Sequence, residues 1–205
     1  MSQMPLILAS ASPRRAELLR EAGIRFEVIV SHAHEPARKP SGIPTPLWPM
    51  ALAYMKAAAV QAQISQIKNQ KSKIKNPVIL AADTIVVAGI PPRETILNKA
   101  ANRAHARRIL SLLNHKIHRV ITGCCLMQGP RVRLFSATAT CRLHLTPHQL
   151  HAYLDSNLWR GKAGAYGIQD PVHDPFVELL AGDFATVVGL PLELVQSELA
   201  SFVKG

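Results

Sequence analysis

The segment PLILASASPRRAELLREAGIRFEVIV (5–30) predicts a strand, a helix and a second strand, joined by short loops. Its apolar run 5–9 is typical of a short buried strand. Ser12 followed by Pro13 matches a helix N-cap with proline at the first helical position, and Gly23 is a suitable C-cap. Residues 26–30 then resume a strand pattern. This end of the chain therefore predicts an α/β fold.

The following segments continue the alternation of helices and strands. Residues 31–49 contain five prolines and must be extended or turning, and an alanine-rich helix follows to about Gln63. The run VILAADTIVVAG (78–89) predicts one long buried strand or a strand pair. Residues 101–113 predict a helix whose apolar face comprises Ile109, Leu112 and Leu113.

The second half of the chain adds hairpins to this pattern. Two strand-like runs, 118–128 and 131–145, meet at the turn Gly129-Pro130 and should pair as a hairpin. A second hairpin is predicted from 177–181 and 184–188. A capping box, Thr146 with Gln149, opens a helix that ends near Leu154, and Pro191 opens a last helix. The glycine-rich GKAGAYG (161–167) is expected to be a binding loop. We therefore expect an α/β chain with a mixed β-sheet and flanking helices.

Length and composition exclude several classes of protein. A chain of 205 residues fits one domain, which can bury roughly 70 per cent of its unfolded surface. Apolar residues make up 48% and charged residues 18%, and no apolar run approaches the ~20 residues that cross a bilayer. A membrane-spanning or disordered protein is therefore excluded. The N-terminus lacks a signal-peptide pattern, so we expect a cytoplasmic protein. Its cysteines, Cys124, Cys125 and Cys141, are expected to be buried and reduced.

The charge distribution favours anionic partners. The formal net charge is +11, and residues 1–160 hold 22 of the 24 basic residues but only 7 of the 13 acidic ones. Such a field attracts nucleic acid or a small polyphosphate. Two segments concentrate the positive charge, 99–119 and the end of the alanine-rich helix, where 64–77 is expected to be a mobile lysine-rich loop. For both segments the favoured interpretation is an ordinary solvated basic surface.

The strand-to-helix connection ASASPRR (9–15) combines hydroxyl groups with two arginines. Backbone N–H groups and the dipole at a helix N-terminus favour an anion. Arg14 and Arg15 add donors suited to phosphate oxygens. The alternative is an ordinary capped helix with exposed arginines. It is not a Walker loop, since GxxxxGK is absent.

Asp83 is the most informative single residue, because it interrupts an apolar strand. A carboxylate in that position needs a cation, which could be Mg²⁺, a lysine or an arginine, and in a cleft it could also accept a proton from water. The alternative is an aspartate in a turn at the end of a strand. Glu35 is the natural second carboxylate. His32 and His34 precede it in the order HAHE, but without a third ligand cluster they favour no zinc site.

The motifs, taken in order, resemble the Maf family of nucleoside triphosphate pyrophosphatases. They are LILASASPRRAELLREAGIRFEVI, Glu35, Lys56 in LAYMKAAAV, AADTIVV, the lysine of ILNKA, HRVITG, KAGAYGIQ and GDFATVVGLPL. The resemblance spans almost the whole chain. It implies a single domain (1–205) of two lobes around a central cleft on a bent mixed sheet, similar to ITPase, often in a homodimer. The implied reaction converts a nucleoside triphosphate to the monophosphate and pyrophosphate, with Mg²⁺ or Mn²⁺.

The resemblance also implies roles for individual residues. Asp83 would be the proton acceptor that activates water, and Glu35 with Asp83 would hold the metal. Thr84 and Gln169 resemble the branch that acts on dTTP and UTP rather than on 7-methyl-GTP. The residues that would contact the triphosphate are Ser10, Arg14, Arg15, Lys56, Lys99 and Lys162.

This chain departs from the usual family motifs at a few positions. Gly161 stands where an aspartate usually precedes the lysine, Asp170 follows Gln169 in place of glycine, and Asn98 and Ala100 flank Lys99.

A second hypothesis is a basic nucleic-acid-binding or division-regulating protein with vestigial catalytic residues. Aromatic residues are only 5% of the chain, which argues against a base-stacking surface. A metal-independent hydrolase is disfavoured because no GxSxG occurs.

Overall fold

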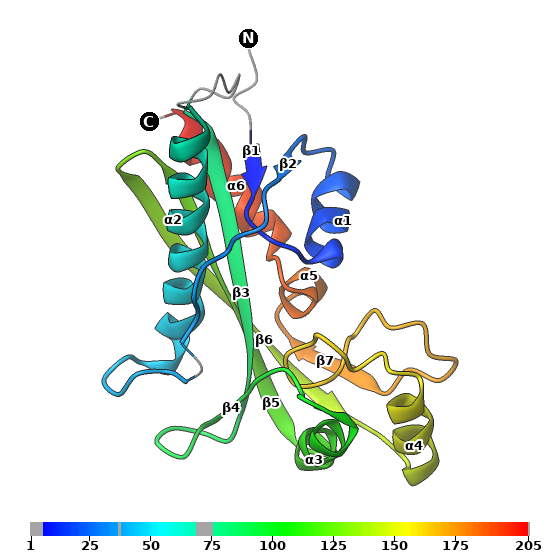
Figure 1. Ribbon diagram of the computed structural model, residues 1–205. Coiled ribbons are helices and arrows are strands. Elements are labelled where there is room, and N and C mark those ends of the chain that lie inside the picture. Colours follow the sequence, from blue (N-terminus) through cyan, green and yellow to red (C-terminus); the bar gives the residue numbers. More distant parts are fainter. Residues whose placement is uncertain (1–5, 37, 69–75, 205) are drawn as a thin grey trace. The chain divides into compact units, whose positions relative to one another are not determined.

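The computed structural model describes residues 6–36, 38–68 and 76–204 and contains one mixed sheet (Figure 1). The strands lie in the order β2-β1-β3-β5-β6-β7, and β4 pairs with β3. Parallel pairs join β1 to β2 and β3, whereas β3–β4 and β6–β7 are antiparallel. The strands are β1 (Leu6–Leu8), β2 (Glu27–Val28), β3 (Val78–Ala88), β4 (Thr95–Leu97), β5 (Ile117–Gln128), β6 (Arg131–Leu143) and β7 (Val177–Ala181). The predicted α/β chain with a mixed sheet is confirmed.

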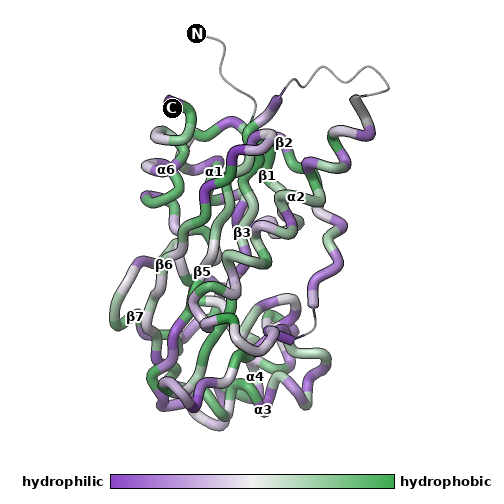
Figure 2. The backbone as a smooth tube through the Cα atoms, turned by 90° about the vertical axis from the view of Figure 1, so that its left-hand side faces the viewer, coloured by the Kyte–Doolittle hydropathy of each residue, from purple (hydrophilic) through white to green (hydrophobic). Residues whose placement is uncertain are grey.

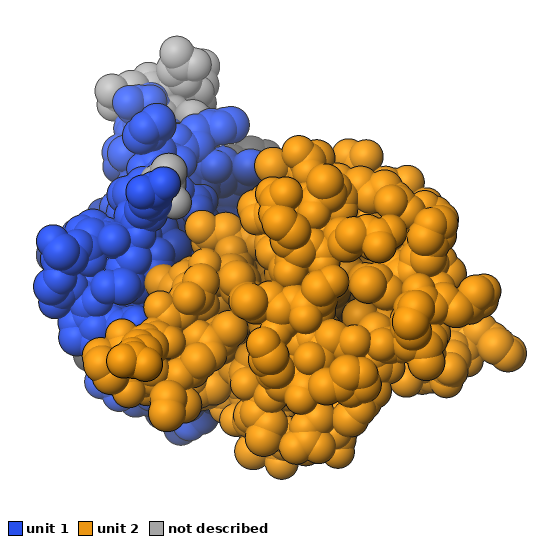
Figure 3. Space-filling model, turned by 90° about the horizontal axis from the view of Figure 1, so that it is seen from below, with its two compact units in different colours: residues 1–83, 122–137, 189–205 blue, residues 84–121, 138–188 orange. Residues whose placement is uncertain are grey.

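The chain forms two compact units, which Figure 3 colours separately. Unit 1 comprises residues 1–83, 122–137 and 189–205, and unit 2 comprises residues 84–121 and 138–188. Strands β3, β5 and β6 each run from one unit into the other. The single domain of two lobes around a cleft stays a prediction.

The first helix, α1 (Pro13–Glu21), begins and ends as its sequence predicts. Ser12 is the N-cap residue and Pro13 opens the helix, where its missing N–H leaves no hydrogen bond unmade. At the other end Gly23 has φ +69° and its N–H donates to the carbonyl of Arg20 at 2.9 Å. That left-handed conformation is one that glycine adopts without steric cost.

The core of unit 1 lies where α2 (Trp48–Lys68) packs on the sheet. Its small and branched residues Ala53, Ala57, Val60 and Ile64 follow a helical spacing and contact β1, β3 and β5. Gly123 on β5 permits the close approach, because a Cβ there would lie 2.3 Å from the backbone nitrogen of Met50. Figure 1 shows α1 and α6 (Leu192–Lys204) on the other side of β1 and β3. Figure 2 shows these strands mainly in the apolar colour, as expected for strands covered on both faces.

The boundaries of α2 differ from the prediction. The helix already begins at Trp48, after the short 3₁₀ turn Thr45–Leu47, because Pro49 is tolerated in a first turn. It continues to Lys68 instead of ending near Gln63. Within the predicted mobile loop 64–77, residues 64–68 are therefore helical, and 69–75 lie outside the described residues. None of the described helices combines the length and apolar character needed to cross a membrane.

Unit 2 has its own core around α3 (Arg103–Leu113) and α4 (Pro147–Asp155). The apolar face of α3 differs from the prediction: Ile109 and Leu113 are buried, but Leu112 is 41% exposed and Leu110 is fully buried in its place. Asn102 caps α3 by accepting a hydrogen bond from the His105 N–H at 2.8 Å. The start of this helix is thereby set one residue after the cap.

The remaining connections are partly as predicted. The hairpin of β5 and β6 turns at Gly129-Pro130, and the Thr146 and Gln149 capping box opens α4. The predicted second hairpin is wrong, because β7 is followed by the short helix α5 (Phe184–Val188). Asp183 decides this by accepting hydrogen bonds from both the N–H and the hydroxyl of Thr186, at 2.7 and 2.5 Å. Strand β7 pairs with β6 instead.

Candidate functional site

The connection between β1 and α1 is held by Ser10 and Arg15. The Oγ of Ser10, which is 8% exposed, accepts hydrogen bonds from the Ser12 N–H and from Nη1 of Arg15, both at 3.2 Å. Nε of Arg15 donates to the carbonyl oxygen of Gly189 at 2.7 Å. Arg14 is half-buried. The ASASPRR segment is therefore a braced loop with two guanidinium groups and not simply an exposed helix end.

Burial and the nearby carboxylates have opposite effects on the pKa of Arg15. Burial lowers the pKa of its guanidinium from the ordinary value, whereas the negative charges of Asp83 and Glu35 raise it. The neighbouring thiol of Cys124 is also buried, and burial raises its pKa to about 12. This thiol is therefore protonated at neutral pH and is no nucleophile. All three cysteines are free and buried, as predicted.

Lys56 brings the two predicted carboxylates together. It projects from α2, and its Nζ lies 2.5 Å from Oδ1 of Asp83 on β3 and 3.2 Å from Oε1 of Glu35. The side chains of Lys56 and Asp83 are 14% and 15% exposed, while that of Glu35 is 43% exposed. The cation that the apolar surroundings of Asp83 demanded is therefore a lysine, 27 residues earlier in the chain.

This carboxylate pair is suited to a hard divalent cation. Its oxygen donors are those that Mg²⁺ and Mn²⁺ prefer, and both carboxylates already converge on one positive charge. The described part of the chain has no group of three or more His, Cys, Asp or Glu side chains placed to hold a metal. His32 and His34 lie in irregular backbone, not on a strand, and both are exposed. Any metal held by Glu35 and Asp83 would need further ligands from water or substrate.

In unit 2, Lys162 is the buried cation of the glycine-rich loop. It is 8% exposed, and its Nζ donates to Oδ1 of Asp170. The other oxygen of Asp170, Oδ2, accepts a hydrogen bond from the Tyr153 hydroxyl at 2.5 Å. The Asp170 carboxylate therefore holds both Lys162 and Tyr153.

Lys99 lies beside the same loop. It forms an isolated antiparallel bridge with Ala163, and the N–H of Gly164 donates to the carbonyl of Leu97 at 3.1 Å. Gly164 has φ +68°, and a Cβ there would lie 2.8 Å from Val86, so the loop needs glycine at this position. Lys99 is exposed. The loop and the end of β4 thus place two predicted phosphate-binding lysines in neighbouring backbone segments of one unit.

The predicted base-reading residues are also in unit 2. Thr84 and Gln169 are both half-buried, and Thr84 follows Asp83 directly on β3. Unit 1 therefore carries Ser10, Arg14, Arg15, Glu35, Lys56 and Asp83, and unit 2 carries Thr84, Lys99, Lys162 and Gln169.

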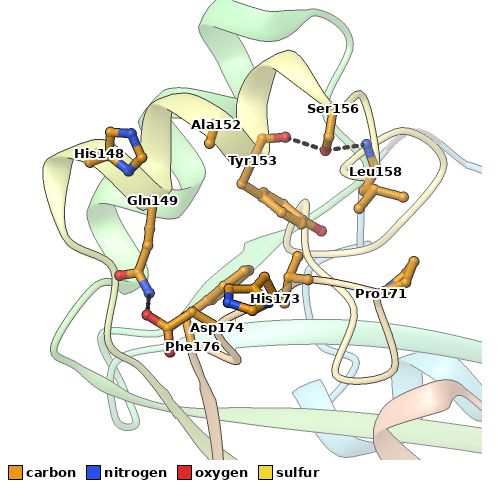
Figure 4. A pocket seen from close by; sticks show the side chains of 11 residues that line it. His148, Gln149, Ala152, Tyr153, Ser156, Leu158, Pro171, His173, Asp174 and Phe176 are labelled. Atoms are coloured by element: carbon orange, nitrogen blue, oxygen red, sulfur yellow. Dashed lines mark hydrogen bonds between the residues drawn. The ribbon is translucent and has the colours of Figure 1, made fainter.

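A cavity of about 410 Å³ lies between α4 and the loop 171–176 of unit 2 (Figure 4). Its walls are mainly apolar, from Leu158, Val172, Phe176 and the ring of Tyr153. None of the predicted site residues lines it. Tyr153 connects the cavity to the pair of Lys162 and Asp170, because its ring lines the cavity and its hydroxyl donates a hydrogen bond to Asp170.

Sequence reasoning missed two polar partners in unit 2. Tyr153 looks like an ordinary apolar position of an amphipathic helix, and nothing local indicates its bond to Asp170. His118 is 2% exposed, and its Nε2 lies 2.7 Å from the Tyr166 hydroxyl. Burial lowers the pKa of His118, and the backbone carbonyl of Lys116 opposes this shift. Both residues lie in motifs quoted above, His118 at the start of HRVITG and Tyr166 inside GKAGAYG, but neither motif indicates that the two side chains meet.

The chain is similar to known proteins over almost its whole length. The family described as Maf-like protein matches residues 5–202. A relative from Bdellovibrio bacteriovorus is 36% identical over 200 residues, covering 96% of this chain and 98% of the relative. One from Bacillus anthracis is 38% identical over 201 residues, covering 96% and 95%. Both carry the name dTTP/UTP pyrophosphatase. The solved structure of the Staphylococcus aureus Ham1 protein aligns with 98% of each chain, at 14% identity and a TM-score of 0.48. On the family match and these full-length relatives, the chain belongs to the Maf family.

Proposed function

We propose that this protein is a nucleoside triphosphate pyrophosphatase that hydrolyses dTTP and UTP to the monophosphate and pyrophosphate. The relatives named dTTP/UTP pyrophosphatase support this, since they match at 36% and 38% identity over nearly their whole length. The observation that carries it is the cluster in which Lys56 binds both Asp83 and Glu35. A carboxylate pair with a resident cation, in the unit that also holds the braced ASASPRR loop, provides both water activation and phosphate binding.

Glu35 and Asp83 are the residues that would hold the divalent metal, Mg²⁺ or Mn²⁺. When bound, such an ion would offset the charge of the triphosphate and make a bound water more acidic. The chain itself provides the proton acceptor: Asp83 takes the proton from the attacking water, and Lys56 orients its carboxylate through the 2.5 Å contact.

The cations of the chain bind the triphosphate. Arg14 and Arg15 act at the start of α1, where the helix N-terminus adds to the attraction, and Ser10 holds Arg15 in place. Lys99 and Lys162 contribute from unit 2. Fixed positive charges of this kind stabilise the charge that develops as the phosphoanhydride bond breaks. Within unit 1, the compact group of Ser10, Arg14 and Arg15 suits a small polyanion better than a nucleic acid, which needs an extended surface.

The base is read by Thr84 and Gln169. An amide both donates and accepts, so Gln169 suits the O4 and N3–H edge shared by thymine and uracil. A purine would leave this half-buried amide without its partner, which lowers kcat/KM by about one to two decades. We also propose that the protein acts in the cytoplasm and forms a homodimer. Light scattering coupled to gel filtration tests the homodimer.

The decisive experiment measures pyrophosphate release from a nucleotide panel with Mg²⁺, with Mn²⁺ and with EDTA. We expect turnover of dTTP and UTP above that of purine nucleotides, lost in EDTA. Arg14→Ala and Lys99→Ala should raise KM and lower kcat together. A first preference for GTP or 7-methyl-GTP would show that the base assignment is wrong. Normal hydrolysis by both variants, with loss of salt-sensitive DNA binding, would favour the nucleic-acid hypothesis.

A further inference from the structure

A buried charged network in unit 2 joins Lys162, Asp170 and Tyr153. The side chains of Lys162 and Asp170 are 10% and 5% exposed, and Tyr153 is 3% exposed. Each oxygen of the Asp170 carboxylate accepts from one of the two partners, Oδ1 from Lys162 and Oδ2 from Tyr153. A buried ammonium without a charged partner is strongly disfavoured, and the carboxylate of Asp170 supplies such a partner to Lys162.

The backbone is shaped to hold this carboxylate. The N–H of Asp170 donates to the carbonyl of Gly167 at 3.3 Å, and the N–H of Val172 donates to the carbonyl of Asp170 at 2.8 Å. A Cβ at Gly167 would lie 2.6 Å from Oδ1 of Asp170, so only glycine lets the carboxylate fold back over the loop. The backbone around Gly167 and Val172 therefore holds the Asp170 carboxylate in this position.

Tyr153 holds the carboxylate from the opposite side. It is carried by α4, and its ring packs edge-on against Phe176 with centroids 4.9 Å apart. In Figure 4 the ring forms part of the cavity wall beside Pro171. Because helix packing fixes the tyrosine and the tyrosine holds Oδ2, the position of Oδ1 beside Lys162 is set by the core of unit 2.

We propose that Asp170 is a positioning residue for Lys162 and that Tyr153 is its anchor. The proposal rests on the proposed function, in which Lys162 contacts the triphosphate. An ammonium has three N–H donors, so a bond to Asp170 is compatible with a phosphate contact. A competing role, in which the carboxylate must leave before substrate binds, fits less well, because Asp170 is buried and held at both oxygens.

The test is a double-mutant cycle on kcat/KM for dTTP. Asp170→Asn should lower kcat/KM about 10-fold or more, with KM raised and kcat lowered, because a charged hydrogen bond is lost. Tyr153→Phe should lower it about threefold, since only the anchor of Oδ2 is removed. In a Lys162→Met background Asp170→Asn should have no further effect. Asp174→Asn is the matched control, because this nearby carboxylate accepts from Gln149 and not from a cation.

Three results would overturn the proposal. An Asp170→Asn effect that is equal with and without Lys162 would show that Asp170 acts on something else, such as the base. A higher kcat/KM for Asp170→Asn would identify Asp170 as a competing anion. A loss of unfolding free energy with unchanged kcat/KM would leave it a purely structural residue. If Asp170→Asn does not fold, the same comparison is made with Tyr153→Phe, which keeps the ring and its packing.

Calorimetric binding of inorganic tripolyphosphate separates this proposal from the proposed function. If the wild type does not hydrolyse nucleotides but binds tripolyphosphate, and Asp170→Asn weakens that binding only when Lys162 is present, the pyrophosphatase assignment fails and the positioning role stands. If the wild type hydrolyses dTTP and the cycle shows no coupling, the positioning role fails alone. A wild type that neither hydrolyses nor binds contradicts both.

Discussion

Replacing Asp83 by asparagine should separate catalysis from stability. The amide is nearly isosteric with the carboxylate and can still accept a hydrogen bond from Lys56, but it cannot take a proton from water and holds a divalent cation poorly. Loss of a general base lowers turnover by about 10² to 10⁴. We therefore expect pyrophosphate release to fall at least about a hundredfold in a folded protein.

The effect on stability can be worked from the contacts of Lys56. Removing one partner of a fully buried ion pair destabilises by about 3–5 kcal/mol. Here Asp83 is 15% exposed, and Lys56 keeps Glu35 at 3.2 Å. The loss is then that of one charged hydrogen bond weakened to a neutral acceptor, about 1–2 kcal/mol. Urea unfolding followed by circular dichroism measures it.

The control for Asp83→Asn is Asp155→Asn, the same chemical change at an exposed carboxylate that pairs with Arg103. Its turnover should equal that of the wild type. If folded Asp83→Asn keeps turnover within tenfold of the wild type, Asp83 is not the proton acceptor. If the unfolding free energy of Asp83→Asn falls by more than about 4 kcal/mol, the Lys56–Asp83 pair contributes as much as a fully buried ion pair, and the estimate made from its partial exposure is wrong.

Three further predictions concern burial and close packing. Gly123→Ala should lower the unfolding free energy by about 2 kcal/mol or more in urea titrations, because the new Cβ would meet the backbone of α2 2.3 Å away; an unchanged midpoint would mean that α2 can shift away from β5 without loss. Burial lowers the pKa of His118, so below about pH 6.5 the unfolded chain binds a proton that the folded chain excludes. The free energy of unfolding should therefore decrease as the pH is lowered. In thermal melts from pH 8 to pH 5, the melting temperature of His118→Gln should decrease less than that of the wild type. Burial raises the pKa of Cys124 and Cys125 to about 12, so a disulfide reagent at pH 8 should modify neither thiol until denaturant is added.

Local signals predicted the elements that are decided locally. The proline after Ser12, the left-handed Gly23 and the capping box at Thr146 all act within a few residues, and each has the predicted effect. The residues 184–188 were misassigned because their β-branched side chains favour a strand. The cap from Asp183 outweighed that preference, and it was visible in the sequence as an aspartate three residues before Thr186.

The three-residue strand β4 could not be predicted from its own residues. A run as short as Thr95–Leu97 has too few positions to show a period, and it is a strand only because β3 offers it a partner. The apolar face of α3 shows the same limit. Leu110 and Leu112 are both leucines on one helix, and only packing against the rest of unit 2 shows which is buried.

The types of chemistry that this protein carries can be named from its amino-acid sequence: an isolated carboxylate in an apolar strand, paired arginines at a helix start, and a lysine in a glycine-rich loop. Which of these charges pair with one another depends on the folded structure, because the partners are distant along the chain. Lys56 reaches Asp83 across 27 residues, and Asp170 joins Lys162 to a tyrosine 17 residues earlier on a helix. Electrostatic attraction depends on the distance between the charges and on their burial, and both are set only when the sheet and the helices pack together.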